Sequence, residues 1–194
     1  MVTRHGESAL NVARIVNGDP SVQVHLTEKG RAESELLGAQ LRNLPIELCV
    51  VTRFGRTRET AEIALERREV KIVVEPSLDD IDVGELEGRT LDEYRVWKRA
   101  HTRADPFPGG ESLDDAAARY ARGFASLLAR PEQTILVVAH EIPLRYALNA
   151  AARSPRPDAP HRKIANATPY VFGKEQLTDA AARLALGWAT EVPS

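Results

Sequence analysis

The most informative residues of this sequence are the tetrapeptide Arg4-His5-Gly6-Glu7, which follows a short apolar start. A histidine beside a permanently charged arginine, at a turn where glycine lets the backbone come close to a ligand, suits nucleophilic attack on an anionic centre such as a phosphoryl group. A solvent-exposed Arg-His pair at a strand end explains four residues equally well when they are taken alone. The rest of the chain has to decide between these interpretations.

Residues of matching chemistry recur further along the chain. Arg56, Asp80 and His140 each follow a different short apolar segment. Because ligands of parallel α/β sheets collect beyond the carboxyl ends of the strands, we expect these side chains to gather with His5 at one edge of a sheet. A nucleophilic imidazole, fixed cations and a carboxylic acid are the groups that metal-free phosphoryl transfer through a phosphohistidine requires.

The elements that must position these groups follow an alternating pattern. Short apolar segments alternate with longer helical periods, which predicts a three-layer α/β fold with a mostly parallel central sheet and helices on both faces. The segment 134–139 is the clearest strand, because it is apolar on both faces. The other expected strands are 1–3, 48–52, 70–74 and 168–172, and the expected helices are 28–43, 57–65, 91–100, 113–129 and 144–152.

Residues 154–160 are expected to form an irregular loop, since they are rich in proline. The sequence contains no internal repeat and no long linker, so we expect residues 1–194 to form a single domain.

The composition limits the classes of partner. The 26 basic and 28 acidic residues give a formal net charge of −2, which provides no overall attraction to nucleic acid or to an anionic membrane. The sequence shows no secretory signal pattern and no bilayer-spanning apolar stretch, so we expect a cytoplasmic protein. Its single cysteine, Cys49, lies in an apolar segment and is expected to be a buried small hydrophobe. We expect a small phosphorylated molecule as the partner, and the oligomeric state, including a homodimer, stays open.

Six short motifs, spread over most of the chain, share their order and spacing with one known family. They are Arg4-His5-Gly6-Glu7-Ser8 with Asn11; Asn17-Gly18 with Leu26-Thr27-Glu28-Lys29-Gly30; Arg56 with Thr60-Ala61; Asp80 with Gly84-Glu85-Leu86-Glu87-Gly88; Gly110-Glu111-Ser112; and Val137-Val138-Ala139-His140. Together they resemble the histidine phosphatase superfamily, in the branch of cofactor-dependent phosphoglycerate mutases and broad-specificity phosphatases. The resemblance implies a phosphoglycerate mutase-like fold and phosphohistidine chemistry, and we expect no cofactor.

The resemblance also implies roles for individual residues. His5 matches the nucleophile, in which one ring nitrogen attacks while a hydrogen bond to the other fixes the tautomer. The family's phosphate pocket combines arginine donors with a protonated second histidine, which stabilise the transferring group. The positions that match this pocket are Arg4, Asn11, Arg56 and His140.

Asp80 occupies the place of the family's general acid, which is more often a glutamate. It would protonate the leaving oxygen and then take a proton from the water that hydrolyses the phosphoenzyme. The adjacent carboxylates of Asp79 and Asp82 are expected to raise its pKa. Because aspartate is one methylene shorter than glutamate, Asp82 stays open as an alternative acid.

Other positions are assigned to substrate binding. Asn17 and Gly18 belong to a matching motif, and Glu141 stands where the family often has glycine. The Glu141 carboxylate would repel phosphate unless it turns away or meets an arginine. Arg53 and Arg58 flank the matched arginine between them, which predicts a cationic rim and a phosphorylated substrate with a second anionic group.

The segment 95–107 mixes cations with aromatic residues and lies where the family builds its substrate lid. The alternative is a solvated helix face with one packed tryptophan, Trp97. His25, His101 and His161 match no family site and are expected at the surface. No spacing of metal ligands stands out, so we expect no metal site.

Only three residues precede Arg4, so the first strand is expected to be short or truncated. A shortened central strand leaves neighbouring backbone groups unpaired, which predicts reduced stability or a start further upstream.

The preferred function is a metal-independent phosphomonoesterase that acts on a small phosphate ester. One alternative is a phosphoglycerate mutase-type phosphomutase, which keeps water away from the phosphoenzyme. The chain is shorter than those mutases, which favours the phosphatase. A second alternative is a catalytically silent phosphate-binding module.

Overall fold

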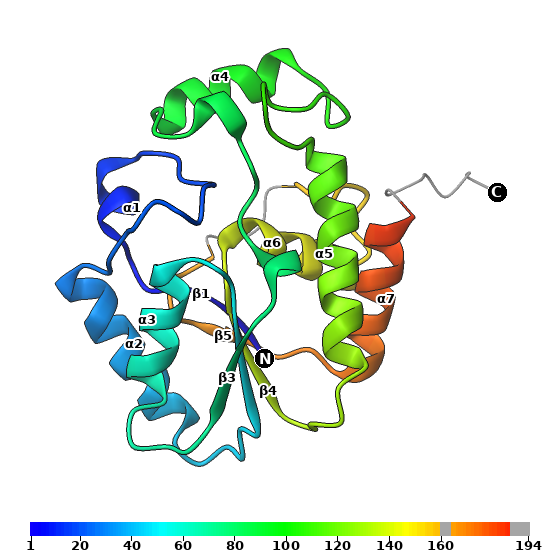
Figure 1. The fold of residues 1–194 in the computed structure, drawn as a ribbon. Helices are drawn as coiled ribbons and strands as arrows, with labels where there is room; N and C mark the ends of the chain where they lie inside the picture. Colours follow the sequence, from blue (N-terminus) through cyan, green and yellow to red (C-terminus); the bar gives the residue numbers. More distant parts are fainter. Residues whose placement is uncertain (160–163, 187–194) are drawn as a thin grey trace.

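A five-stranded sheet forms the centre of the molecule in a computed structural model, which describes residues 1–159 and 164–186 (Figure 1). The strands lie in the order β3-β2-β4-β1-β5. The first four are parallel, and β5 runs antiparallel to β1. Their bounds are β1 (Val2–Arg4), β2 (Leu48–Val51), β3 (Lys71–Val74), β4 (Ile135–Ala139) and β5 (Pro169–Tyr170).

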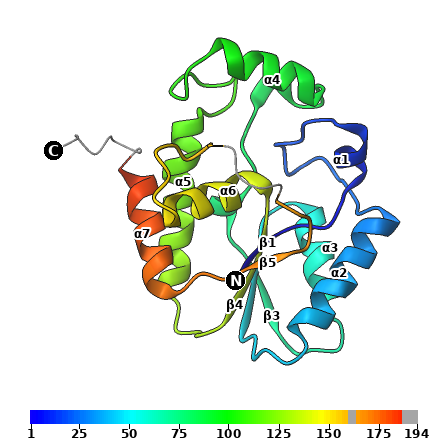
Figure 2. The same cartoon turned by 180° about the vertical axis from the view of Figure 1, so that it is seen from behind.

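Helices cover both faces of this sheet, which confirms the predicted three-layer α/β architecture. The helices of the two faces lie on opposite sides of the sheet, whether the molecule is seen from the front or from behind (Figures 1 and 2). The first side holds α2 (Glu28–Leu41) and α3 (Gly55–Ala64), and the second holds α5 (Leu113–Leu128), α6 (Glu141–Ala151) and α7 (Lys174–Ala185).

The remaining elements lie beyond the carboxyl ends of the strands. Helix α4 lies over this end of the sheet, and α1 lies beside it (Figure 1). These elements are α1 (Ala9–Ala13), α4 (Leu91–Ala100) and two short 3₁₀ helices, η1 (Pro76–Leu78) and η2 (Gly84–Leu86).

The apolar core has two parts, one on each face of the sheet. Strand β2 is buried along its whole length and contributes to both, because successive side chains of a strand point to opposite faces. Leu48 and Val50 pack on the side of α5 and α6, whereas Cys49 and Val51 pack on the side of α2 and α3. Burial raises the pKa of the Cys49 thiol to about 12, which agrees with the predicted small hydrophobe.

All five predicted strands are present, although β5 has only two residues. The five predicted helices are present as well, but α3 begins at Gly55 and α6 begins at Glu141, both earlier than predicted. The structure adds α1, α7 and the 3₁₀ helices, which were not predicted. The predicted loop 154–160 contains no helix or strand over residues 154–159, and its last residue and His161 lie outside the described residues.

Strand β1 is short, as predicted, and its partners are in place. Its three residues pair with Val137, Val138 and Ala139 of β4, and the Met1 carbonyl accepts a hydrogen bond from the Val137 amide. No helix in the described part of the chain is long and apolar enough to cross a membrane.

Candidate active site

The register of the central strands brings two histidines together. Arg4 of β1 pairs with Ala139 of β4, so His5 and His140 both follow the last paired residues of adjacent strands. The His5 amide donates a hydrogen bond to the Ala139 carbonyl (3.0 Å), and the two imidazole rings lie edge to face with 5.5 Å between their centroids. Both side chains are buried, with 2% of His5 and 0% of His140 exposed.

A cleft of about 420 Å³ opens at this end of the sheet, and residues of α4 line part of it. Most of the residues that the sequence assigns to the site line it. These are Arg4, His5, Asn11, Asn17, Gly18, Arg56, Asp80 and Glu141. His140 is an exception, because it is fully buried and does not line the cleft wall.

The hydrogen bonds of His5 define its tautomer. Nδ1 lies 2.7 Å from the carbonyl oxygen of Gly6, which only accepts, so Nδ1 carries the proton and donates it. Nε2 accepts from Nε of Arg56 at 3.0 Å and therefore holds the lone pair. Burial, together with the charges of Arg56 and Arg4, holds the pKa of His5 well below its ordinary value. The imidazole is therefore neutral near pH 7, as a nucleophile must be.

Arg56 connects the other groups of the site. Its side chain is only 4% exposed, so it is not an ordinary solvated helix residue. Besides His5, the guanidinium donates to the Asn17 side chain and carbonyl, to Oδ2 of Asp80 at 3.1 Å and to Nδ1 of His140 at 3.2 Å. These bonds hold the guanidinium in one orientation before a ligand arrives.

The second histidine differs from the expectation of a protonated ring. A guanidinium only donates, so Nδ1 of His140 accepts from Arg56, and Nε2 lies 2.9 Å from the Thr52 hydroxyl oxygen. Burial, followed by the charge of Arg56, lowers the pKa of His140 well below its ordinary value. In this arrangement His140 is neutral.

The pKa of Asp80 is raised, as predicted, but for another reason than the predicted one. Burial is the main cause, partly offset by Arg56, and Glu141 adds a smaller repulsion. Asp79 was expected to raise the pKa of Asp80 by repulsion. Its carboxylate instead accepts hydrogen bonds from the Arg53 amide (2.9 Å) and from Nε of Arg53 (2.5 Å), and this cation offsets its charge.

Asp82, the alternative acid, is exposed and lies outside the cleft. Its carboxylate accepts a hydrogen bond from the Gly84 amide at 2.9 Å. Of the two candidate acids, Asp80 is the one that shares the cleft with His5.

The predicted source of a cationic rim was wrong. Arg53 pairs with Asp79, and Arg58 pairs with Glu62 at 3.7 Å, and neither arginine lines the cleft. The cations at the rim come instead from α4, which belongs to the segment predicted as the substrate lid, and from α6, which the sequence did not single out for this role. They are Arg95, Lys98 and Arg145.

The Glu141 carboxylate forms ion pairs with two arginines. It lies 2.7 Å from Nη1 of Arg4 and also accepts from Arg145, one helical turn further along α6. This charge pairing removes the repulsion that an unpaired carboxylate at this position would exert on a phosphate.

Two matching glycines and Asn11 have structural roles that the motifs alone did not reveal. A Cβ on Gly6 would lie 2.4 Å from the Gly30 carbonyl, so glycine is needed for packing against α2 rather than for approach to a ligand. A Cβ on Gly18 would lie 2.1 Å from the Ile81 carbonyl. Asn11 lines the cleft and also caps α1, because its side-chain oxygen accepts from the Ser8 amide at 3.1 Å.

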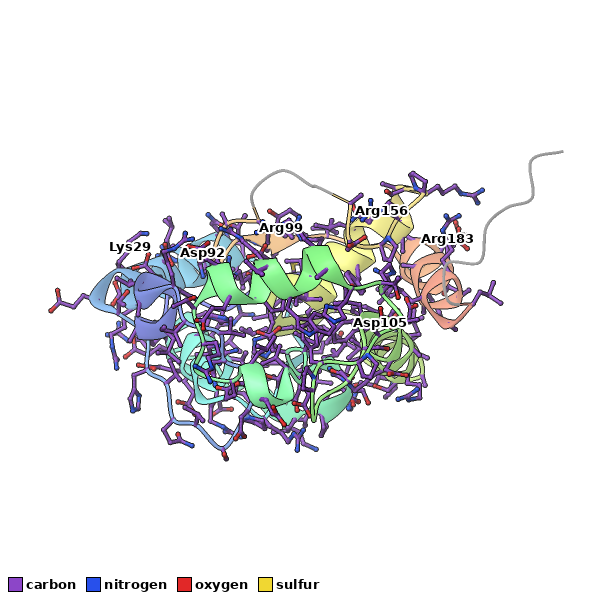
Figure 3. All side chains as sticks on the ribbon, turned by 90° about the horizontal axis from the view of Figure 1, so that it is seen from above. Lys29, Asp92, Arg99, Asp105, Arg156 and Arg183 are labelled. Carbon is purple, nitrogen blue, oxygen red and sulfur yellow. The ribbon has the colours of Figure 1, made fainter. Side chains whose placement is uncertain are left out.

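Helix α4 forms the roof of the cleft. Tyr94, Arg95 and Lys98 line the cleft, and Trp97 packs on Phe107 with 4.2 Å between ring centroids. Seen from above, α4 runs across the molecule between Asp92 and Arg99 (Figure 3). The first part of the segment 95–107 therefore has both of the features that the sequence suggested: it covers the cleft, as a substrate lid would, and its Trp97 is packed.

The loop that carries Asp80 is held by an arginine that was not predicted to belong to the site. Arg119 of α5 donates to the carbonyls of Ser77 (3.1 Å), Asp79 (3.0 Å) and Asp80 (3.1 Å). It also makes two bonds to the Glu111 carboxylate, at 3.1 and 2.5 Å. The motif Gly110-Glu111-Ser112 was a signal for Glu111, but nothing in the sequence marked Arg119.

We expect Arg119→Met to lower kcat about tenfold with little change in KM, because Asp80 is then less well placed for proton transfer. The loss should be larger for alkyl phosphates than for p-nitrophenyl phosphate, whose leaving group needs no proton. Steady-state kinetics of both substrates measure this. Arg122→Met, on the exposed side of the same helix, is the matched control. Equal losses for both substrates would mean that Arg119 supports the fold alone.

Elsewhere, the structure places His25 and His101 at the surface, as predicted. Among the described residues, no group of three or more histidine, cysteine and acidic side chains is arranged to hold a metal ion.

Comparison with known proteins identifies the family of the chain. The sequence model of the histidine phosphatase superfamily (branch 1) matches residues 1–184. The chain therefore belongs to the histidine phosphatase superfamily, as its motifs predicted. Members of this family are phosphatases or mutases, so the protein is a phosphoryl-transfer enzyme.

Its relatives include both mutases and phosphatases. The chain is 34% identical over 151 residues to a probable phosphoglycerate mutase, GpmB, of Erwinia tasmaniensis, covering 74% of this chain and 69% of the relative. It is 30% identical over 192 residues to the 2,3-bisphosphoglycerate-dependent phosphoglycerate mutase of Bartonella henselae, covering 89% and 90%. The structure of a mycobacterial glucosyl-3-phosphoglycerate phosphatase in complex with VO3 superposes with a TM-score of 0.69 at 26% identity, covering 86% and 88%.

Proposed function

We propose that the protein is a metal-independent phosphomonoesterase that hydrolyses a small phosphate ester through a phosphohistidine on His5. The observation that carries this proposal is the neutral His5, with its Nε2 lone pair beside Arg56, in the same cleft as a carboxyl group whose pKa is raised. Nucleophile, cation and acid are the parts that the reaction needs.

In the first step, Nε2 of His5 leaves its hydrogen bond from Nε of Arg56, its lone pair attacks phosphorus, and the bond between phosphorus and the ester oxygen breaks. The protonated carboxyl group of Asp80 gives its proton to that oxygen, and the alcohol leaves. The hydrogen bond from Nδ1 to the Gly6 carbonyl stabilises the positive charge that develops on the ring.

In the second step, water attacks the phosphohistidine and passes a proton to the Asp80 carboxylate. The bond between phosphorus and Nε2 breaks, which regenerates neutral His5 and releases inorganic phosphate. Arg4 and Arg56 would bind the phosphoryl oxygens in both steps, and their charge stabilises the transition state more than the ground state.

A phosphomutase is the second candidate, because two of the relatives are named phosphoglycerate mutases. The two reactions differ in the acceptor of the phosphoryl group, which is water in one and a substrate hydroxyl in the other. Phosphate release from a panel of esters, measured with chelator present, separates them. Stoichiometric release supports the phosphatase. Isomerisation of phosphoglycerate without release would support the mutase, and phosphate binding without turnover would support a silent module.

We expect Asp80→Asn to reduce kcat for alkyl phosphates by about 10²- to 10⁴-fold, because an alkoxide leaves poorly without a proton. The same variant should hydrolyse p-nitrophenyl phosphate at a rate close to that of the wild type in the first step. Burst kinetics with both esters measure the difference. Asp82→Asn is the matched control, and a leaving-group dependence in that variant instead would transfer the acid role to Asp82.

The pH profile should reflect both groups. The lowered pKa keeps His5 neutral down to lower pH, and the raised pKa keeps Asp80 protonated up to higher pH, so the two shifts together open a pH range in which both groups are reactive. In kcat/KM against pH, activity should fall below the pKa of His5 and above the pKa of Asp80. Asp80→Asn should lose the alkaline limb, and an unchanged alkaline limb in that variant would contradict the assignment.

A further inference from the structure

We infer that the substrate of the proposed phosphatase carries an apolar, uncharged alcohol, such as an aromatic or branched hydrocarbon alcohol, and no second acidic group. This inference rests on the proposed function. It replaces the expectation from the sequence that a cationic rim binds a second anion.

The first observation is the lining of the cleft beyond His5 and Arg56. Apolar side chains from three separate parts of the chain face each other there, and all are partly exposed, so their apolar surface is available to a ligand. Burying such surface favours the binding of an apolar group. We call these residues the apolar belt: Leu10, Ile15, Val16, Leu91, Tyr94 and Ile142.

The second observation concerns the charges at the rim. Arg95 lies 3.1 Å from Asp92, and Lys98 lies 3.9 Å from Asp158. The third rim cation, Arg145, pairs with Glu141. In the described part of the chain, every cation that lines the cleft rim thus has a carboxylate partner. These partners are shared, because Glu141 also pairs with Arg4, Asp158 with Arg103 and Arg156, and Asp92 with Arg14.

These pairs disfavour a second anion. A carboxylate on the substrate would have to compete with Glu141 or Asp158, which both line the cleft, for these cations. At the other end, Asp80 is the only carboxylate paired with Arg56 in the described structure, and its pKa is raised, so its charge is easily lost. The cleft therefore matches one anionic group, at His5, followed by an apolar one.

The third observation is the volume. About 420 Å³ lies in the range of clefts that hold whole small molecules, and a phosphoryl group alone would leave most of it empty. An aromatic ring next to the phosphate would occupy the space between α1 and α4, where it contacts the apolar belt.

Binding of phosphonates tests the inference without requiring turnover. Benzylphosphonate, 4-carboxybenzylphosphonate and methylphosphonate share the same acidic head and differ only in the attached group. By titration calorimetry with wild-type protein, we expect benzylphosphonate to bind about tenfold more tightly than either of the others. Equal or tighter binding of the carboxylated compound, or of methylphosphonate, would overturn the inference.

Two variants make the test specific to the cleft. Val16→Thr replaces a methyl group by a hydroxyl of similar size, and it should weaken benzylphosphonate several-fold while leaving methylphosphonate unchanged. Glu141→Gln frees Arg4 and Arg145, and it should improve 4-carboxybenzylphosphonate relative to benzylphosphonate by about tenfold. Glu62→Gln, an exposed glutamate of α3, is the control. An unchanged affinity ratio of benzylphosphonate to methylphosphonate in Val16→Thr would contradict the role of the apolar belt. An unchanged ratio of 4-carboxybenzylphosphonate to benzylphosphonate in Glu141→Gln would contradict the role of the rim charges.

The outcomes separate this inference from the function on which it rests. A protein that prefers benzylphosphonate but releases no phosphate from any ester would keep the inference about the ligand and overturn the phosphatase. A protein that hydrolyses all esters through His5, with no preference for apolar alcohols, would keep the phosphatase and overturn the inference.

Discussion

His5→Ala is expected to reduce phosphate release from every ester by about a thousandfold or more, because no other nucleophile of the site replaces the lone pair on Nε2. The reason lies in the hydrogen bonds that His5 makes. Its Nδ1 proton is directed to the Gly6 carbonyl and burial favours its neutral form, so the ring has the tautomer and charge needed for attack before substrate binds. The substrate then displaces the hydrogen bond from Arg56 to Nε2. Phosphate release under substrate saturation, with circular dichroism to verify folding, measures the effect.

The control for this variant is His25→Ala, which removes an exposed imidazole that lies outside the cleft, 3.7 Å from Glu59. We expect wild-type rates from it. Residual activity of more than a few per cent in His5→Ala would show that phosphoryl transfer does not depend on this residue.

Arg56→Met is expected to lower kcat by about 10²- to 10³-fold, because it removes a cation that is held in place for the transferring oxygens. It should also weaken inhibition by inorganic phosphate. The pKa of His5 and that of His140 should both rise, since the charge of Arg56 contributes to the lowered pKa of each. The acidic limb of the pH profile should then move to higher pH.

Since Arg56 is buried, its removal also affects stability, and Arg56→Lys separates the two effects. Lysine keeps the charge but cannot make the same set of directed bonds, so part of the activity should return while the acidic limb stays near that of the wild type. Arg58→Met, an exposed arginine of the same helix, is the control. A wild-type pH profile in Arg56→Met would contradict the role given to this guanidinium.

Much of the fold and part of the site were predictable, because the relevant signals are local. An apolar strand such as 134–139 shows its burial on both faces in its composition, and parallel strands place the residues that follow them at one edge of the sheet. These two regularities are enough to predict that His5, Arg56 and Asp80 lie close together in one site. Helix starts were harder, since α6 begins directly after His140, without a capping side chain to mark it.

Other features depend on contacts between distant residues, and the sequence does not carry them. Arg119 holds the Asp80 loop across about forty positions of the chain, and Arg53 is neutralised by Asp79, 26 positions further along. The same holds for protonation: a histidine that follows a strand does not show that it will be completely buried beside an arginine, as His140 is. Short or alanine-rich helices, such as α1 and α7, were missed because their apolar pattern is weak.

The measurement that tests the central claim most directly is the trapping of a phosphoenzyme during turnover. Protein is mixed with a ³²P-labelled phosphate ester, quenched in alkali within milliseconds, digested, and the labelled peptide is identified by mass spectrometry. The proposed function predicts label on the peptide that contains His5, stable in alkali and lost in acid, and absent from His5→Ala. Phosphate release from the wild-type protein with no label on that peptide would contradict it.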